Sequence, residues 1–348
     1  MIERTLIRPR ILYAIQGTGN GHLSRASAFL PHLLERGELD ILVSGRDVNV
    51  RLNYPVKYRL NGAGFVFGRH GSFDWWQTLA IQRPWQLLRD SGRIPLHDYD
   101  LVINDFEPVT ALAARRQGYR RLVGLSHQAS FLSPKTPRPA LVKAPHAEWL
   151  FRHYAPCPAS LGLHFEAYDD FIYTPVIRPG VRALQATMDR NEILVYLPAY
   201  GDDLLHEFLR RYGPNQDWVV FSKTIRKSVT IGRFTWHPAG DALFLQHLEH
   251  ASGVLCGAGF ETPAETLFLG KKLMVIPMKH QFEQACNAEA LHRMGILVGQ
   301  GLDPATGTML QSWLTHPPRP PYAWPDHSRQ MVDLCFDISG QLSEKPLY

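Results

Sequence analysis

The segment "CGAGFETPAETLFLGKKLMVIPMKHQFEQACNAEAL", residues 256–291, contains the strongest fold signal in the chain. A predicted strand ends at Cys256, and the turn after it leads into a helix that starts near Thr262 and Pro263. Proline suits a helix start because the amide proton that it lacks would have no partner there. Gly270 ends this helix, the next strand covers Lys272–Pro277, and "HQFEQACNAEAL" opens a further helix. Strands alternating with helices predict a parallel sheet with helices on both faces.

The turn after the first of these strands predicts a binding site for a diphosphate. Glycines let the backbone come close to a ligand, and a helix start presents unpaired N–H groups and a partial positive charge. The residues that would line this site are Gly257, Ala258, Gly259 and Phe260. Glu265 follows about one helical turn later, where its carboxylate could accept hydrogen bonds from two neighbouring ribose hydroxyls.

Amide side chains further along predict contacts with a sugar. Gln281, Gln284 and Asn287 could each hydrogen-bond to sugar hydroxyls. For any one residue of the set, Glu265 included, an ordinary solvated position on a helix is an equally good interpretation. The ordered set of glycine turn, acid and amides is what favours a nucleotide-sugar site.

The same alternation of strands and helices runs through both halves of the chain. We predict the strands Ile11–Ile15, Leu39–Ser44, Asp100–Asp105 and Arg121–Leu125, and then Glu192–Leu197, Trp218–Phe221, Gly253–Cys256 and Lys272–Pro277. Two prolines and a glycine within residues 173–191 mark a boundary. The expected fold is therefore α/β, with two doubly wound, Rossmann-like domains in residues 1–180 and 190–325. Ligands are expected at the carboxyl ends of the strands.

A second glycine turn lies in "AIQGTGNGHLSRA", residues 14–26, between a predicted strand and a helix. Its spacing is GxGxG rather than the GxGxxG of dinucleotide-binding proteins, so NADP binding is the weaker interpretation. We expect this turn to face the cleft between the domains. The cleft residues predicted here and at the end of a neighbouring strand are Gly19, Asn20, Gly21, His22 and His127.

His22 is the candidate general base, because the unperturbed pKa of an imidazole lies near neutrality. Asp105 ends a neighbouring predicted strand, where its carboxylate could hold the second ring nitrogen of His22. Asp105 itself is the reserve base, and a helix-start residue without a catalytic role is the alternative for His22. For His127 the alternative is a structural histidine with satisfied hydrogen bonds.

Composition and charge narrow the class of protein. The chain has 348 residues, a formal net charge of +5 and four well separated cysteines. It contains neither an apolar run of membrane-spanning length nor a secretory signal, so we expect a cytoplasmic protein with reduced thiols. Residues 1–185 contain 23 Lys and Arg against 15 Asp and Glu, a balance of +8, which suggests an anionic partner. No nucleic-acid-binding motif is present, so we expect no nucleic acid partner.

The combination of "GTGNGH" with "GAGFETPAE" and "IPMKHQFEQACNAEAL" resembles glycosyltransferases of the GT-B fold. It is most similar to the family-28-like branch, which includes the peptidoglycan N-acetylglucosaminyltransferase. This resemblance implies two facing Rossmann-like domains, with the nucleotide-sugar donor in the second domain and a hydroxyl acceptor in the first. It also implies that the last helix, within residues 326–348, crosses back onto the first domain.

The resemblance also implies roles for individual residues. Glu265 matches the ribose-binding acid of the family, the stretch from Gly257 to Phe260 matches its diphosphate loop, and His22 matches the histidine after its glycine turn. The residues that match the donor-sugar stretch are His280, Gln281 and Gln284. The segment "FTWHP", residues 234–238, falls where the base pocket lies. The family commonly has Gln-Gln where this chain has Glu283 and Gln284, which leaves the sugar open.

We therefore expect an inverting glycosyltransferase that uses a uridine diphosphate sugar. Retaining GT-B enzymes space two glutamates by eight positions, whereas Glu261 and Glu265 are four apart. No metal ion or cofactor is expected, because the DxD sequence Asp98–Asp100 precedes a strand and so lies at the amino edge of the sheet, away from the site. The alternatives are a sugar-nucleotide 2-epimerase of the same fold and a nonenzymatic nucleotide-binding module.

The segment "SFDWWQTLAIQRPWQLLRDSGRI", residues 72–94, mixes tryptophans with arginines. This mixture suits an anionic membrane surface or a lipid-linked acceptor, such as a cell-envelope glycan precursor. We therefore expect a peripheral location on the inner face of the cytoplasmic membrane. The alternative interpretation is a helix pair buried in the core of the first domain.

Overall fold

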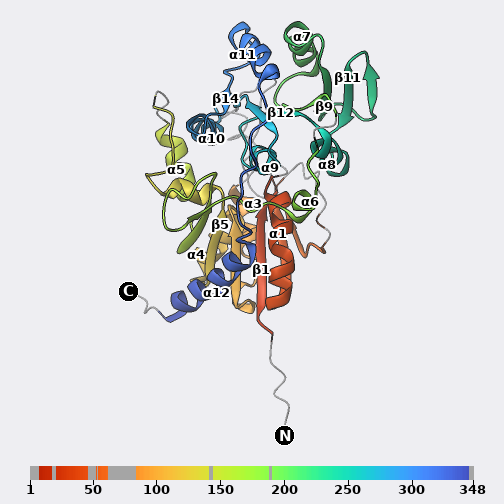
Figure 1. The fold of residues 1–348 in the computed structure, drawn as a ribbon. Coiled ribbons are helices and arrows are strands. Elements are labelled where there is room, and N and C mark those ends of the chain that lie inside the picture. Colours follow the sequence, from red (N-terminus) through yellow and green to blue (C-terminus); the bar gives the residue numbers. More distant parts are fainter. Residues whose placement is uncertain are drawn as a thin grey trace.

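The computed structural model describes residues 8–17, 21–45, 52, 54–61, 84–140, 144–187 and 190–344. Within these ranges the strands form two sheets of seven strands each, one above the other in Figure 1. The first sheet has the order β3-β2-β1-β4-β5-β6-β7 and the second β10-β11-β9-β8-β12-β13-β14. All described pairings are parallel except that of β10 with β11. The predicted α/β fold with two Rossmann-like domains is confirmed.

The strands of the first sheet are β1 Arg10–Gln16, β2 Glu38–Ser44, β3 Tyr58–Leu60, β4 Leu101–Asp105, β5 Leu122–Ser126, β6 Ala159–Leu163 and β7 Ile172–Tyr173. Those of the second are β8 Glu192–Tyr196, β9 Asp217–Ser222, β10 Val229–Ile231, β11 Phe234–Pro238, β12 Gly253–Cys256, β13 Lys272–Val275 and β14 Leu297–Val298. In both sheets the chain doubles back from one edge to the centre, so each sheet is doubly wound.

The helices of the first half are α1 Gly21–Arg36, α3 Pro84–Ser91, α4 Pro108–Gln117, α5 Pro145–His153 and α6 Pro179–Arg182, with the 3-10 turns η1 Leu96–Asp98 and η2 Gln128–Leu132. The later helices are α7 Asp202–Tyr212, α8 Asp241–His250, α9 Glu261–Phe268, α10 Phe282–Arg293, α11 Pro304–Thr315 and α12 Ser328–Glu344. Among the described residues, no helix is long and apolar enough to cross a membrane.

The central strands are apolar on both faces because helices cover both faces of each sheet. In β1 the residues Ile11, Tyr13 and Ile15 belong to one core cluster, while Leu12 and Ala14 belong to another on the opposite face. This arrangement aligns the carboxyl ends of β1 and β4, whose residues Ile15 and Asp105 are register partners. The last residues of β1 and β4 therefore lie next to each other.

The last helix, α12, crosses back and packs on the first sheet, as the resemblance implied (Figure 1). Its buried residues include Met331, Val332 and Cys335. Two ion pairs connect its exposed side to α1. These pairs are Arg36 with Asp333 and Arg329 with Glu35.

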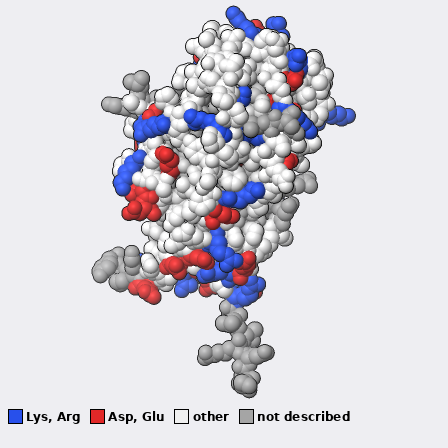
Figure 2. Space-filling model, viewed as in Figure 1, with Lys and Arg blue, Asp and Glu red and all other residues white. Residues whose placement is uncertain are grey.

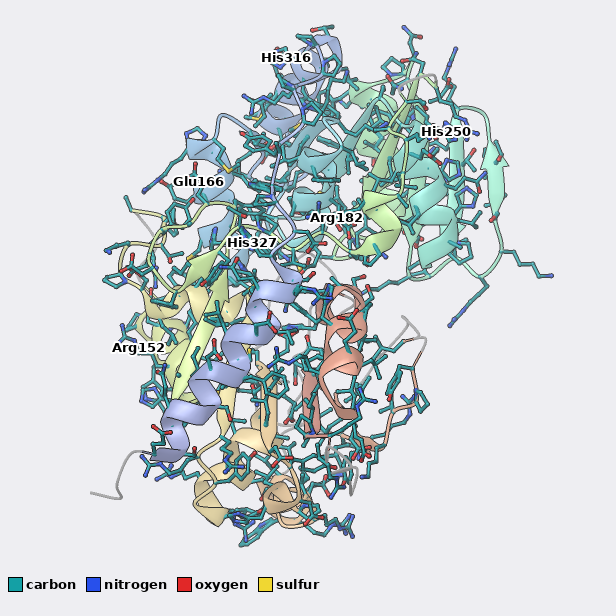
Figure 3. The ribbon with its side chains drawn as sticks, turned by 60° about the horizontal axis from the view of Figure 1, so that its bottom comes forward. Arg152, Glu166, Arg182, His250, His316 and His327 are labelled. Atoms are coloured by element: carbon teal, nitrogen blue, oxygen red, sulfur yellow. The ribbon has the colours of Figure 1, made fainter. Side chains whose placement is uncertain are left out.

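The outgoing and returning connections between the two sheets touch each other. Arg182 in α6 donates a hydrogen bond to the carbonyl of Trp324 at 3.4 Å and lies 3.6 Å from the carboxylate of Asp326. The ring of His327 makes an edge contact with Tyr173, the last residue of β7. Figure 3 shows Arg182 and His327 at this double crossing, next to the start of α12.

Candidate active site

His22 lies in the first turn of α1, directly after the glycine turn that follows β1. Its Nδ1 is 2.8 Å from Oδ1 of Asp105, the last residue of β4. The predicted contact between these two side chains is therefore present. Gly21 begins α1, while Gly19 and Asn20 fall outside the described residues.

Asp105 is fully buried and is held by a second partner, Arg25. The Nη2 of Arg25 lies 2.7 Å from Oδ1 and 2.9 Å from Oδ2 of Asp105. Burial opposes ionisation of Asp105, but the charges of Arg25 and His22 outweigh it and lower its pKa. Asp105 is therefore an ionised carboxylate at neutral pH.

Arg25 also reaches the second half of the molecule. Its Nη1 forms an ion pair with Oε1 of Glu261, the first residue of α9. Figure 1 shows α9 directly above α1. Burial raises the pKa of Glu261 to about 7, although the charge of Arg25 pulls in the opposite direction. Four ionisable side chains thus meet where the carboxyl ends of the two sheets face each other.

Sequence reasoning missed Arg25. The signal for it was a basic residue three positions after His22, between the buried Leu23 and Ala26 on the apolar face of α1. A buried arginine requires an anionic partner, and such a position is uncommon for this residue type.

The turn from Gly257 to Phe260 follows β12 and leads into α9, as predicted. The start of α9 has no hydrogen bond from a capping side chain. Open space lies where a side chain at Gly259 would project. Free N–H groups beside open space are suited to an anion.

Glu265 lies in α9 and is buried against Arg178 from the connection between the sheets. The guanidinium donates from Nε to Oε1 at 2.6 Å and from Nη2 to Oε2 at 3.2 Å. Sequence reasoning missed this pair, because Arg178 lies 87 residues earlier in the chain. The ribose-binding role of Glu265 stays a prediction. It requires the Arg178 side chain to move away from the carboxylate so that ribose hydroxyls can bind there.

The loop before α10 is organised by the predicted amide residues. The side chain of Gln281 caps α10 by accepting the N–H of Gln284, whose own Oε1 accepts the N–H of Met278 at 2.9 Å. His280 has a φ of 62°, a left-handed backbone conformation that is uncommon for a residue other than glycine. Glu283 accepts a hydrogen bond from Gln128 of η2 at 3.2 Å.

His127, from the first half, contacts residues of the second half beside the turn from Gly257 to Phe260. Its ring stacks on Phe260 with centroids 4.1 Å apart and planes 6° apart. Its Nδ1 lies 2.8 Å from the carbonyl of Leu163, and its Nε2 lies 2.9 Å from Oδ1 of Asn287. Burial lowers the pKa of His127 to about 4. Both ring nitrogens face oxygen acceptors, and a neutral ring can donate to only one of them. A role for His127 in the reaction stays a prediction.

A family model described as Glycosyl transferase family 1 matches residues 9–316. The chain belongs to this family. It is a glycosyltransferase of the GT-B type, which agrees with the resemblance seen in its motifs. A search of curated proteins found no significant relative.

Solved structures of similar fold are also glycosyltransferases. A UDP-glucosyltransferase from Polygonum tinctorium has a TM-score of 0.57 at 14% identity, covering 96% of this chain and 94% of that one. Acinetobacter baumannii MurG has a TM-score of 0.51 at 14% identity, covering 97% and 100%. The spinosyn forosaminyltransferase SpnP has a TM-score of 0.54 at 15% identity, covering 97% and 96%. At these identities the likeness shows the fold alone.

Other features of the glycosyltransferase lie away from this centre. Asp98 is in η1 and Asp100 precedes β4, so the DxD sequence is at the amino edge of the sheet, as predicted. Among the described residues, no group of three or more His, Cys, Asp or Glu side chains is arranged to hold a metal ion. The segment 234–238 is strand β11, in which Phe234 and Trp236 are buried in the core of the second half. A base-pocket role for this segment stays a prediction.

A cavity of about 90 Å³ lies in the first half of the glycosyltransferase. It is lined by residues that include Asn104, Ser126, Phe151 and Arg152. Asn104 precedes Asp105 in β4, so its side chain points to the opposite face of the sheet from that of Asp105. The cavity is therefore separate from the His22 and Asp105 pair.

The segment 72–94, with its predicted membrane contact, lies largely outside the described residues. Its described part includes α3, where Trp85 is 82% exposed. The alternative of a helix buried in the core therefore does not hold for Trp85. On the face shown in Figure 2, basic and acidic side chains are interspersed, and no large area carries one sign.

Proposed function

We propose that this protein is an inverting, metal-independent glycosyltransferase that transfers a sugar from a nucleoside diphosphate to a hydroxyl acceptor. The observation that carries the proposal is the contact of 2.8 Å between His22 and Asp105, at the sheet edge that faces the start of α9. A general base and a diphosphate cradle are the two groups that an inverting transfer needs.

The proposed reaction begins with the acceptor hydroxyl beside His22. Nδ1–H of His22 donates to Asp105, so Nε2 carries the lone pair that takes the hydroxyl proton. The acceptor oxygen forms a bond to the anomeric carbon while the bond from that carbon to the diphosphate oxygen breaks. The nucleoside diphosphate leaves with the electron pair, and the free N–H groups at the start of α9 stabilise its charge.

Uridine diphosphate is the proposed leaving group. Several neighbours support it by their descriptions, which include a UDP-glucosyltransferase and a complex with UDP. A thermal-shift panel of nucleotide sugars tests the donor, because a ligand that binds only the native state raises the melting temperature. The panel should single out uridine diphosphate sugars, and a response confined to another base would contradict this choice.

Product analysis with a labelled donor then tests the reaction class. Transfer with inversion at the anomeric carbon supports the proposal. A retained configuration, or a donor that is epimerised rather than transferred, contradicts it, and binding without any product indicates a nonenzymatic module.

For the acceptor we propose a lipid-linked glycan precursor, presented at the inner face of an anionic membrane. The support is the exposed Trp85 near Arg89 and Arg93 in the described part of residues 72–94. Flotation with vesicles that contain anionic lipid tests this surface. Binding that weakens with salt is expected, and its absence contradicts the proposed location.

A further inference from the structure

Arg25 is at the centre of a cluster that joins α1, β4 and α9. It lies three positions after His22 on α1, and its side chain is buried. One of its terminal nitrogens contacts both oxygens of Asp105 and lies 3.0 Å from Nδ1 of His22. The other terminal nitrogen pairs with Glu261. The proposed reaction uses His22 and Asp105, but it assigns nothing to Arg25 or Glu261.

The contacts of Arg25 determine how Asp105 is presented to His22. Two hydrogen bonds from a planar guanidinium hold a carboxylate in one orientation. Here they hold Oδ1 of Asp105, which is also the partner of Nδ1 of His22. Nη2 of Arg25 has only two protons, so when both are donated to Asp105, Nδ1 of His22 cannot accept from Arg25 and itself donates to Oδ1 of Asp105. Arg25 thereby favours the tautomer of His22 whose Nε2 is free to act as a base.

The charge of Arg25 has a second effect, which opposes the first. A base becomes an imidazolium when it takes a proton, and a cation 3.0 Å from the ring disfavours that state. Glu261 is partly ionised at neutral pH, since its pKa is about 7, and in that form its carboxylate offsets this effect by pairing with the same guanidinium from α9. The ionisable side chains that face this cluster from the surrounding elements are Tyr13, Asp105, His127, Glu261 and Glu265.

We propose that Arg25 is a positioning residue for His22 and that Glu261 is the counter-charge that limits the effect of Arg25 on the ring. Because Glu261 belongs to the second half of the molecule, the base reaches its full strength only while the two halves are in contact. This inference rests on the proposed function, in which His22 takes the acceptor proton.

Nuclear magnetic resonance titration of isotope-labelled imidazole nitrogens tests the coupling without any acceptor. The His22 signal is assigned by its loss in His22→Ala. In the wild type, His22 should be in the tautomer protonated at Nδ1. Arg25→Met should move the His22 titration to higher pH, because it removes a neighbouring positive charge. Glu261→Gln should move the His22 titration to lower pH, because it removes a negative charge.

The matched control is Arg36→Met, which removes an exposed cation from the same helix and should leave the pKa of His22 unchanged. Arg25→Met leaves the buried Asp105 without its main partner, so its circular dichroism spectrum must first show that it folds. If it does not fold, Glu261→Gln decides alone, since it retains the size of the side chain. An unchanged or raised pKa of His22 in Glu261→Gln would overturn the inference.

The pH profile of kcat/KM for donor turnover adds a second readout. Its acidic limb should move to higher pH in Arg25→Met and to lower pH in Glu261→Gln, a pair of opposite shifts that a structural role would not produce. Full activity in His22→Ala would overturn the proposed base. Unchanged profiles in the other two variants, with His22→Ala inactive, would overturn only the role of Arg25 and Glu261.

Discussion

At the residue scale, the pair of His22 and Asp105 gives the most direct test of the chemistry. His22→Ala should lower the turnover of a labelled nucleotide sugar by roughly 100-fold or more, because it removes the group that accepts the proton. Donor affinity, measured by calorimetry, should stay within a few-fold of the wild type. Near-normal turnover would reduce His22 to a helix-start residue and leave Asp105 and His127 as the remaining candidates.

Glu265 provides a second test at this scale. Glu265→Gln retains the shape of the side chain but weakens its hydrogen bonds to a ribose, so donor binding should lose roughly 1–3 kcal/mol. The measurement is calorimetric titration with a nucleotide sugar. Glu289→Gln is the matched control, because its carboxylate forms an exposed pair with Arg293 on α10. Wild-type affinity in Glu265→Gln would mean that the donor site lies elsewhere.

The sequence could predict the contact between His22 and Asp105 because His22 follows β1 and Asp105 ends β4, and the carboxyl ends of neighbouring parallel strands share one edge. It could not predict the partner of Arg25, because Glu261 lies 236 residues away on the other half. That ion pair depends on how the halves meet, for which no local pattern exists. The same reason explains why Arg178 was missed as the partner of Glu265.

At the element scale, the long buried strands could be predicted to within one or two residues. Strands covered on both faces are continuous apolar runs, as in "ILYAI" of β1. The sequences of short or exposed strands contain no such apolar run. The strand β10 has only three residues, all exposed, and β7 and β14 have two each. These elements are specified by pairing with their neighbours rather than by their own sequence.

The docking of α12 gives a prediction about stability. Met331 is fully buried in the core of the first half, so Met331→Ala should lower the free energy of unfolding by about 2–5 kcal/mol. Chemical denaturation measures the change. Gln330→Ala, at the exposed position next to it, should have a much smaller effect. Equal effects of both substitutions would show that α12 does not depend on this buried face.

At the scale of the whole molecule, His127 makes the stability depend on pH. Its pKa is about 4 in the folded protein, against about 6.5 in an unfolded chain. Between these values the unfolded chain binds a proton that the folded protein does not. The contribution of His127 to the free energy of unfolding is therefore complete above about pH 6.5 and is lost as the pH falls towards 4.

Denaturation at pH 7.5 and pH 5 checks this dependence. From the two pKa values, the wild type should lose about 2 kcal/mol more than His127→Gln between these conditions. The raised pKa of Glu261 acts in the opposite direction over part of this range, which is why the comparison is made with a variant that retains Glu261. An equal loss in both proteins would contradict a neutral, buried His127.

The return of α12 to the first sheet has a consequence for synthesis on the ribosome. All strands and helices of the second half, β8 to α11, precede α12 in the chain. They can fold as soon as they emerge. In the first half, the apolar surface that α12 covers stays exposed until α12 has been synthesised. The half that is translated first is thus the one completed last. Nascent chains halted before Ser328 should bind chaperones through α1 and β4, and release them once α12 has emerged.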